Sequence, residues 1–265
     1  MEKRLIFTLG HKVDITFNLI SPGTFIMGDE EEFNELGWAE KPKHEVILSK
    51  HFYLSKCPVT RQQWQYVMGY KTYEYEGEIH LPAVNMTWKE ALTFTRKMNE
   101  KFGSLLPEGY EFSLPTEAQW EYACRAGTTT AWNNGTDCVT NSVGIDANLD
   151  LLGRYGPSAS KTYPGQYLPN KWGLYDMHGN MFEVVMDKMS GSFSSALEVE
   201  PRGPVGTSAN AIYRVIRGGG CVQAVRCRSA AREHSNQYAY VGPEKGGNTG
   251  ARFAFIRKVE NSEWR

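Results

Sequence analysis

The sequence lacks any apolar run that could cross a membrane. A spanning helix needs about 20 consecutive apolar residues, and no stretch of the 265-residue chain approaches that length. The apolar part of residues 1–10 is also too short for a signal peptide. We therefore expect a soluble chain, displayed at a cell surface only if an export signal once preceded residue 1.

An excess of charge of either sign is also missing. The 29 Lys and Arg residues nearly balance the 30 Asp and Glu residues, and the formal net charge is −1. A near-neutral chain has no overall field that attracts a nucleic-acid backbone. The composition therefore argues against a nucleic-acid partner.

Common short catalytic signatures are absent as well. Five scattered cysteines include no Cys-x-x-Cys pair and no Cys/His array with zinc spacing. The glycines at 218–220 precede no helix-like pattern, so they form neither a phosphate loop nor a dinucleotide fingerprint. We expect Cys57, Cys124 and Cys138 to be buried or incidental thiols.

The chain does contain much glycine and proline, 26 and 12 residues, together with 41% hydrophobic residues. That apolar content suffices for a sizeable core in one large domain or two small ones. No internal repeat or linker divides the chain, and residues 127–172 and 190–213 have an irregular pattern. We predict a single α+β domain over residues 1–265 with few regular elements and long loops.

Three helix starts share the same chemistry. In each, a Thr hydroxyl can accept the N–H three residues on, and the Glu or Gln side chain there reaches back, which makes a capping box. The boxes are Thr60 with Gln63, Thr87 with Glu90, and Thr116 with Gln119. Apolar positions from Ala91 to Phe102 give the middle helix one buried stripe. It should end near Gly103 and the third helix near Gly127, each with a left-handed cap.

Short strands are predicted where β-branched or alternating residues lie between Gly and Pro. These candidates cover residues 12–20, 23–27, 44–48, 51–54, 214–217 and 252–256.

A series of short motifs follows in a fixed order. They are Phe25-Ile-Met-Gly28, Glu40-Lys-Pro-Lys-His44, Pro58-Val-Thr60, Leu81-Pro-Ala-Val-Asn85, Leu114-Pro-Thr-Glu-Ala-Gln-Trp-Glu-Tyr-Ala123, Gly173-Leu-Tyr-Asp-Met-His-Gly-Asn180 and Arg217-Gly-Gly219. The series resembles the formylglycine-generating-enzyme domain, also called the sulfatase-modifying-factor domain, over nearly the whole chain. The resemblance implies an elaborated C-type-lectin-like fold with little regular secondary structure. It leaves function to be argued from the site.

One implied function is copper-dependent oxidation of a sulfatase cysteine to formylglycine. In catalytic members, two thiolates shortly after the Gly-Gly turn hold copper(I), a soft ion that thiolates favour. Here Cys221 and Cys227 follow the glycines, but Gly220 stands at the family's Ser and Cys221 at its Tyr. The segment is also shorter, so the pair departs from the catalytic motif and two unrelated thiols are the favoured interpretation.

The other implied function is ligand binding without catalysis. The chain also resembles the variable proteins of diversity-generating retroelements, in which a C-terminal segment between two anchors is diversified and displayed. The anchors here are residues 214–219 and 250–253, with Ala251 replacing the usual Phe. The candidate contact residues between them are Cys221, Val222, Ala224, His234, Ser235, Asn236, Tyr238, Tyr240 and Asn248. Tyr supplies rigid amphipathic area and Ser or Asn adaptable hydrogen bonds. The alternative is an ordinary loop with locally packed tyrosines.

A calcium site is implied by the turn that contains Asp176. By the resemblance, Asp176 and Glu183 would supply carboxylates, and Gly179 and Met181 backbone carbonyls. Hard oxygen ligands on an irregular loop suit Ca²⁺. The alternative is a carboxylate pair that makes hydrogen bonds within turns.

Together these patterns favour a non-catalytic protein that binds a protein or other macromolecular ligand through residues 221–249, within the segment 214–255. The main alternative is the copper-dependent formylglycine-generating oxidase with Cys221 and Cys227. An accessory or structural member of the family is the third interpretation.

Overall fold

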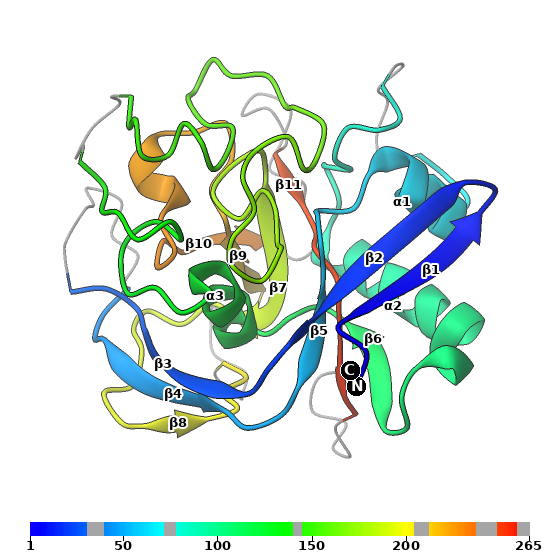
Figure 1. Ribbon diagram of the computed structural model, residues 1–265, viewed down its shortest axis with the longest axis horizontal. Coiled ribbons are helices and arrows are strands. Elements are labelled where there is room, and N and C mark those ends of the chain that lie inside the picture. Colours follow the sequence, from blue (N-terminus) through cyan, green and yellow to red (C-terminus); the bar gives the residue numbers. More distant parts are fainter. Residues whose placement is uncertain (31–39, 72–77, 140–144, 204–211, 237–247, 259–265) are drawn as a thin grey trace.

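The computed structural model describes residues 1–30, 40–71, 78–139, 145–203, 212–236 and 248–258. Within them, three α-helices and three small sheets are joined by long connections, with α3 (Glu117–Arg125) near the centre (Figure 1). No helix in these residues is both long and apolar enough to cross a membrane.

The largest sheet joins the two ends of the chain. Its antiparallel strands, in spatial order, are β1 (Arg4–Gly10), β2 (Val13–Ile20), β5 (Phe52–Ser55), β12 (Ala254–Arg257) and β6 (Tyr110–Ser113). Along β2, Val13, Ile15 and Phe17 are buried while Asp14 is exposed, the period-two pattern of a half-buried strand. Because β12 pairs with both β5 and β6, the C-terminal strand is an interior strand of this sheet.

The helices α1 (Arg61–Met68) and α2 (Trp88–Phe102) pack beside this sheet (Figure 1). All three predicted capping boxes form, at Thr60, Thr87 and Thr116. The predicted apolar stripe of α2 is buried. At its middle the Phe94 ring stacks on Phe253, with ring centroids 4.1 Å apart, and on Trp64 at 5.5 Å. Aromatic stacking therefore links the two helices to the C-terminal end of the chain.

The helix ends differ from the prediction. Gly103 has a right-handed backbone, φ −57°, and continues into the 3-10 turn η1 (Gly103–Leu105), so the left-handed cap expected there is wrong. This turn is closed by the Leu106 N–H, which donates to the Gly103 carbonyl at 3.3 Å. After α3 the left-handed cap is Ala126, with φ 45°, followed by Gly127 at φ 90°.

Two smaller sheets lie around α3. One consists of β10 (Glu233–Asn236), β9 (Tyr213–Arg217), β7 (Phe182–Lys188) and β11 (Thr249–Gly250), with β11 parallel to β7. The other consists of β3 (Gly23–Met27), β4 (His44–Leu48) and β8 (Glu198–Val199). Every residue of α3 is buried, including Glu117, Glu121 and Arg125. A helix that carries three buried charges needs partners for them from other elements.

All six predicted strands are present. β3 and β4 have the predicted bounds, and β2, β5, β9 and β12 lie within two residues of theirs. β1, β6, β7, β8, β10 and β11 were not predicted. β7 has no alternation because its first four residues are all buried. The described residues of 127–172 contain no helix or strand, as predicted. The fold is α+β, with few regular elements and long connections, as predicted.

Candidate ligand-binding surface

A glycine turn leads from β9 into the C-terminal segment. Gly218 and Gly219 have φ of 90° and 73°, a left-handed backbone that glycine adopts without strain. A Cβ on Gly219 would also lie 2.8 Å from the Cα of Cys227. The glycines are therefore required both by the turn and by the close approach of η2 (Ala224–Cys227).

Arg217, the last residue of β9, holds the chain that returns after η2. Its guanidinium has no exposed surface and forms an ion pair with Glu121 of α3. Its Nη1 also donates to the carbonyls of Ala230 and Ala231, both at 2.7 Å. One buried side chain thus satisfies both a carboxylate and the backbone of an irregular stretch.

The rear anchor is built in the same way. Arg252 meets Glu183 through two parallel hydrogen bonds, each 2.9 Å, from its Nε and Nη2. It also donates to three backbone carbonyls, those of Ser55, Lys56 and Tyr175. Both ends of the segment are therefore fixed by buried, charge-assisted hydrogen bonds.

Two more arginines secure the middle of the segment. Arg228 contacts Glu40 at 2.9 Å and Asp29 at 3.1 Å. Arg232 forms a two-bond pair with Glu117, at 2.8 and 2.9 Å. These contacts tie residues 228–232 to the start of α3 and to the chain around β3 and β4.

The two cysteines of the oxidase alternative are buried to different extents. Burial raises the pKa of the Cys227 thiol to about 12. Burial also raises the pKa of Cys221, although Lys161 and Arg154 oppose the shift. Both groups are therefore thiols near neutral pH, and copper(I) would have to displace their protons to bind.

Three of the four residues of the expected calcium site already accept hydrogen bonds within the protein. Arg252 and the indole N–H of Trp120, at 2.7 Å from Oε2, take both carboxylate oxygens of Glu183. Asp176 accepts the Gly165 N–H at 2.6 Å, and the Gly179 carbonyl accepts the N–H of Met181 at 2.8 Å. No group of three or more His, Cys, Asp or Glu side chains with metal-site geometry occurs among the described residues. These contacts agree with the alternative, in which the carboxylates make structural hydrogen bonds.

The predicted contact residues fall into two groups. Cys221 and Val222 follow the Gly turn, and Asn248 lies against Gly220 there. His234 and Ser235, half-buried, and Asn236 belong to β10, where Asn236 pairs with Tyr213 at the other end of β9. The two ends of β9, Tyr213 and Arg217, are four residue steps apart, which is roughly 13 Å along the strand. The two groups therefore lie at opposite ends of β9.

The remaining predicted contact residues are Ala224, Tyr238 and Tyr240. Ala224 is fully buried in a small cluster with Trp132 and Leu149, so the expectation that it faces solvent is wrong. It lies inside η2, whose short turn directs this side chain into the protein. Tyr238 and Tyr240 lie outside the described residues.

A pocket that the sequence analysis did not find adjoins the first group. It has a volume of about 410 Å³ and is lined by Arg154, Tyr155 and Tyr167 on one side and Gln223 on the other. The Gly156 N–H donates to the Val222 carbonyl at 2.7 Å and holds the two sides together. The available signal was the presence of tyrosines among Gly and Pro in the stretch 127–172.

Exposed apolar side chains belong to the lining or are adjacent to it in sequence. Ile145, which lines it, is 79% exposed, and Leu151 and Leu168 are 59% and 57% exposed. The Leu168 N–H donates to the Leu151 carbonyl at 2.9 Å, so these two leucines are neighbours. We call Cys221, Val222, Gln223 and Asn248, with this pocket and its three apolar residues, the C-terminal surface.

Comparison with known proteins agrees with this architecture. Residues 12–252 match the family described as the sulfatase-modifying factor enzyme 1-like domain. The chain belongs to this family.

Its relatives have diverse names. The serine/threonine-protein kinase pkn1 of Chlamydia pneumoniae is 29% identical over 245 residues, which cover 82% of this chain and 35% of the kinase. The chaperone protein LppX of Paenibacillus barcinonensis is 27% identical over 288 residues, 93% of this chain and 98% of its own. The formylglycine-generating enzyme of Streptomyces coelicolor is 32% identical over 155 residues, covering 54% and 43%. The chain thus spans about a third of the kinase and less than half of this enzyme.

Solved structures share the fold at low sequence identity. Treponema denticola variable protein 1 superposes with a TM-score of 0.77 and 22% identity, covering 97% of this chain and all of that one. PvdO from Pseudomonas aeruginosa gives a TM-score of 0.72 at 22% identity, covering 95% and 97%. These similarities establish the fold, and the function has to be argued from the site.

Proposed function

We propose that this protein is a non-catalytic binding protein that holds a protein ligand on its C-terminal surface. The observation that carries the proposal is a contrast within one segment. Arg217, Arg228, Arg232 and Arg252 are buried and paired, and they fix the backbone. Cys221, Val222, Gln223 and Asn248 remain half-buried between them, where a side chain can change without disturbing the anchors.

The chemistry of this surface suits a protein partner. Ile145, Leu151 and Leu168 offer apolar area that would be buried on association. Tyr155 and Tyr167 add amphipathic rings, a residue type enriched at the energetic centres of protein interfaces. Polar Gln223 and Asn248 supply hydrogen-bonding groups at the margin. The similarity to a variable protein supports the further proposal that positions in 221–249 are diversified.

The oxidase alternative is less well supported, because Gly220 and Cys221 stand where the family's catalytic motif has Ser and Tyr, and the segment is shorter. Burial also raises the pKa of Cys227 to about 12, so a metal ion would have to displace its proton. A binding protein needs no pair of thiolates.

Site-specific photocrosslinking tests the proposal. A photoreactive phenylalanine analogue replaces Gln223 on the C-terminal surface, or exposed Lys50 in the turn between β4 and β5 as the control. We expect position 223 to give a discrete protein adduct in a lysate of the source cells, and position 50 to give none. Identical adducts at both positions, or none at either, contradict the proposal.

A copper assay distinguishes the binding proposal from the oxidase alternative. The protein is titrated with copper(I) and incubated with a sulfatase peptide and oxygen, and aldehyde is measured, with Cys221→Ser as the matched variant. We expect no aldehyde from either protein. Aldehyde formation that requires Cys221 would overturn the binding proposal.

A further inference from the structure

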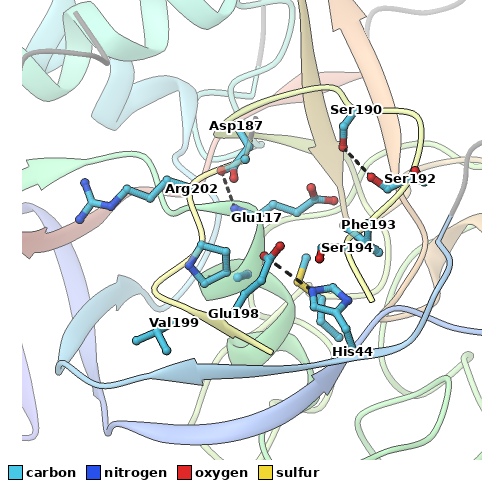
Figure 2. A pocket seen from close by; sticks show the side chains of 14 residues that line it. His44, Glu117, Asp187, Ser190, Ser192, Phe193, Ser194, Glu198, Val199 and Arg202 are labelled. Atoms are coloured by element: carbon cyan, nitrogen blue, oxygen red, sulfur yellow. Dashed lines mark hydrogen bonds and ion pairs between the residues drawn. The ribbon is translucent and has the colours of Figure 1, made fainter. Parts of the chain in front are cut away.

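A second pocket lies away from the C-terminal surface, and none of its lining residues belongs to residues 221–249. It has a volume of about 400 Å³ and lies between the three-stranded sheet, the first turn of α3 and the chain around β8 (Figure 2). Its polar lining includes His44 of β4, Asp187 of β7 and Glu198 of β8. The pocket is independent of the function proposed above.

His44 has an unsatisfied nitrogen in this pocket. Its side chain is 1% exposed and packs on the ring of Phe193, with centroids 5.0 Å apart. Nδ1 lies 3.2 Å from the Pro42 carbonyl, which can only accept, so this nitrogen carries the hydrogen. When the ring is neutral, Nε2 is therefore an acceptor without a hydrogen-bond partner, whereas in a protonated ring it would pair with Glu198.

A second acceptor group lies close to this nitrogen. Nε2 lies 3.9 Å from Oε2 of Glu198, beyond hydrogen-bond length, and Figure 2 shows the two side chains facing each other. Two acceptors that face each other at this distance are satisfied together by a donor placed between them. A group with several N–H bonds and a positive charge meets both requirements.

Asp187 makes another part of the lining acidic. Its carboxyl group is buried, and Oδ2 accepts the Glu117 N–H at 2.7 Å at the start of α3. This contact also occupies the helix N-terminus, which would otherwise favour an anion. The other acid of the lining, Glu117, is already paired with Arg232, and the Arg202 side chain points away from His44 and Asp187 in Figure 2.

The rest of the lining is mixed. Met27, Ala118, Phe193 and Val199 contribute carbon surface, and the lining also includes Ser190, Ser192 and Ser194. Acceptor groups and hydroxyls between apolar side chains match a charged amine on a short hydrocarbon chain. An anion would face two carboxylates, and a metal ion would find no group of three His, Cys, Asp or Glu ligands among the described residues.

We infer that this pocket binds a small alkylammonium compound, with an ammonium group donating to His44 Nε2 and to the Glu198 carboxylate. Asp187 adds a second acceptor within the same pocket, and the hydrocarbon chain packs on Phe193 and Val199. A volume of about 400 Å³ accommodates a molecule the size of a linear diamine.

Calorimetric titration of the full chain with 1,5-diaminopentane at pH 8 and low salt tests this inference. We expect saturable binding of one molecule, and at least a tenfold loss of affinity in Glu198→Gln and in His44→Phe. The matched control is Glu45→Gln, which removes the same charge from the neighbouring exposed position of β4 and should change affinity less than twofold. A thermal melt establishes that each variant is folded. The Glu198 side chain is 35% exposed, so Glu198→Gln is expected to disturb the fold less than His44→Phe.

Three outcomes would overturn the inference. The first is the absence of saturable diamine binding to the wild-type protein. The second is equal binding of 1,5-pentanediol, which has the same chain without the charge. The third is an unchanged affinity in Glu198→Gln. None of these results bears on the protein ligand of the C-terminal surface, so the two proposals fail separately.

Discussion

The two halves of the core are stabilised by different interactions. Around α2, the buried residues are apolar and aromatic, and Phe94 stacks between Trp64 and Phe253. Around α3, buried charges lie at the centre, and Glu121 meets both Arg125 and Arg217. Burial alone would raise the pKa of Glu121, but the two arginines outweigh it and the pKa is lowered.

The difference explains how long connections without secondary structure can be ordered. Apolar packing needs a regular helix or strand face to bring side chains together. A buried arginine instead binds several backbone carbonyls and a carboxylate, as Arg217 and Arg252 do. The α3 half can therefore support a binding surface on irregular chain, which is where functional residues commonly lie.

The largest expected effect comes from breaking a buried ion pair. Arg217→Met should destabilise the protein by roughly 3–5 kcal/mol, because it leaves Glu121 with one of its two cations and the carbonyls of 230 and 231 without donors. Chemical denaturation measures the change. The double variant Arg217→Met with Glu121→Leu should be less destabilised than the single one, since it removes the uncompensated charge. If the two are equal, the pairing does not stabilise this region in the way described.

In the aromatic half, Phe94→Ala should cost about 3–4 kcal/mol, because it opens a cavity between Trp64 and Phe253. This substitution leaves a cavity and no unpaired charge. Phe94→Leu, which fills part of that cavity, should therefore recover a large part of the loss. The same denaturation experiment applies. A loss below about 1 kcal/mol would show that the stacking contributes little, and the contrast between the halves would weaken.

The pH dependence of stability should reveal a buried acid near α3. Burial, with Glu117 nearby, raises the pKa of Asp187 from 3.8 to about 7. The folded state therefore keeps its proton between about pH 4 and pH 7, where the unfolded chain is ionised. This contribution to stability is complete below about pH 4 and is lost as the pH rises through 7.

Asp187→Asn should remove this decrease in stability with rising pH. Between pH 4 and pH 8 we expect the wild-type protein to lose about 4 kcal/mol more than the variant. Asn can still accept the Glu117 N–H, so the start of α3 keeps its hydrogen bond. If the stabilities of the wild-type protein and the variant change in parallel with pH, the raised pKa of Asp187 is contradicted.

The smallest effects are expected on the C-terminal surface. Gln223→Ala and Cys221→Ser should each change the free energy of unfolding by no more than about 0.5 kcal/mol, because these half-buried side chains lie outside the anchors. The control is Ala224→Asp, which buries a charge and should unfold the segment or the protein. Large losses at 221 and 223 would mean that these positions serve the fold.

How much the sequence could predict depends on the range of the interaction. The capping boxes at Thr60, Thr87 and Thr116 are local, since hydroxyl and partner are three residues apart, and all three were predicted correctly. The order of short motifs also identified the family and the fold, because that order is specific. By contrast, the left-handed cap at Gly103 was wrong, because a following 3-10 turn competes with it.

The candidate site was less predictable because its residues meet through tertiary contacts. The burial of Ala224 depends on Trp132 and Leu149, which come from a stretch without regular structure. The calcium assignment depended on Glu183 being available, yet Arg252, 69 positions away, takes its carboxylate. The pocket proposed to bind an alkylammonium compound brings together His44 and Glu198. These residues are 154 positions apart in sequence, and no local pattern connects them.

The sequence by itself determined the helix starts, half of the strands and the family, because each rests on the spacing of neighbouring residues. Only the tertiary structure decided which buried carboxylate meets which arginine, which side chains of the C-terminal segment face outward, and where an acceptor such as His44 Nε2 is left without a donor. The physical reason is that burial and charge pairing depend on distances in space. In a chain with few regular elements, sequence separation carries little information about those distances.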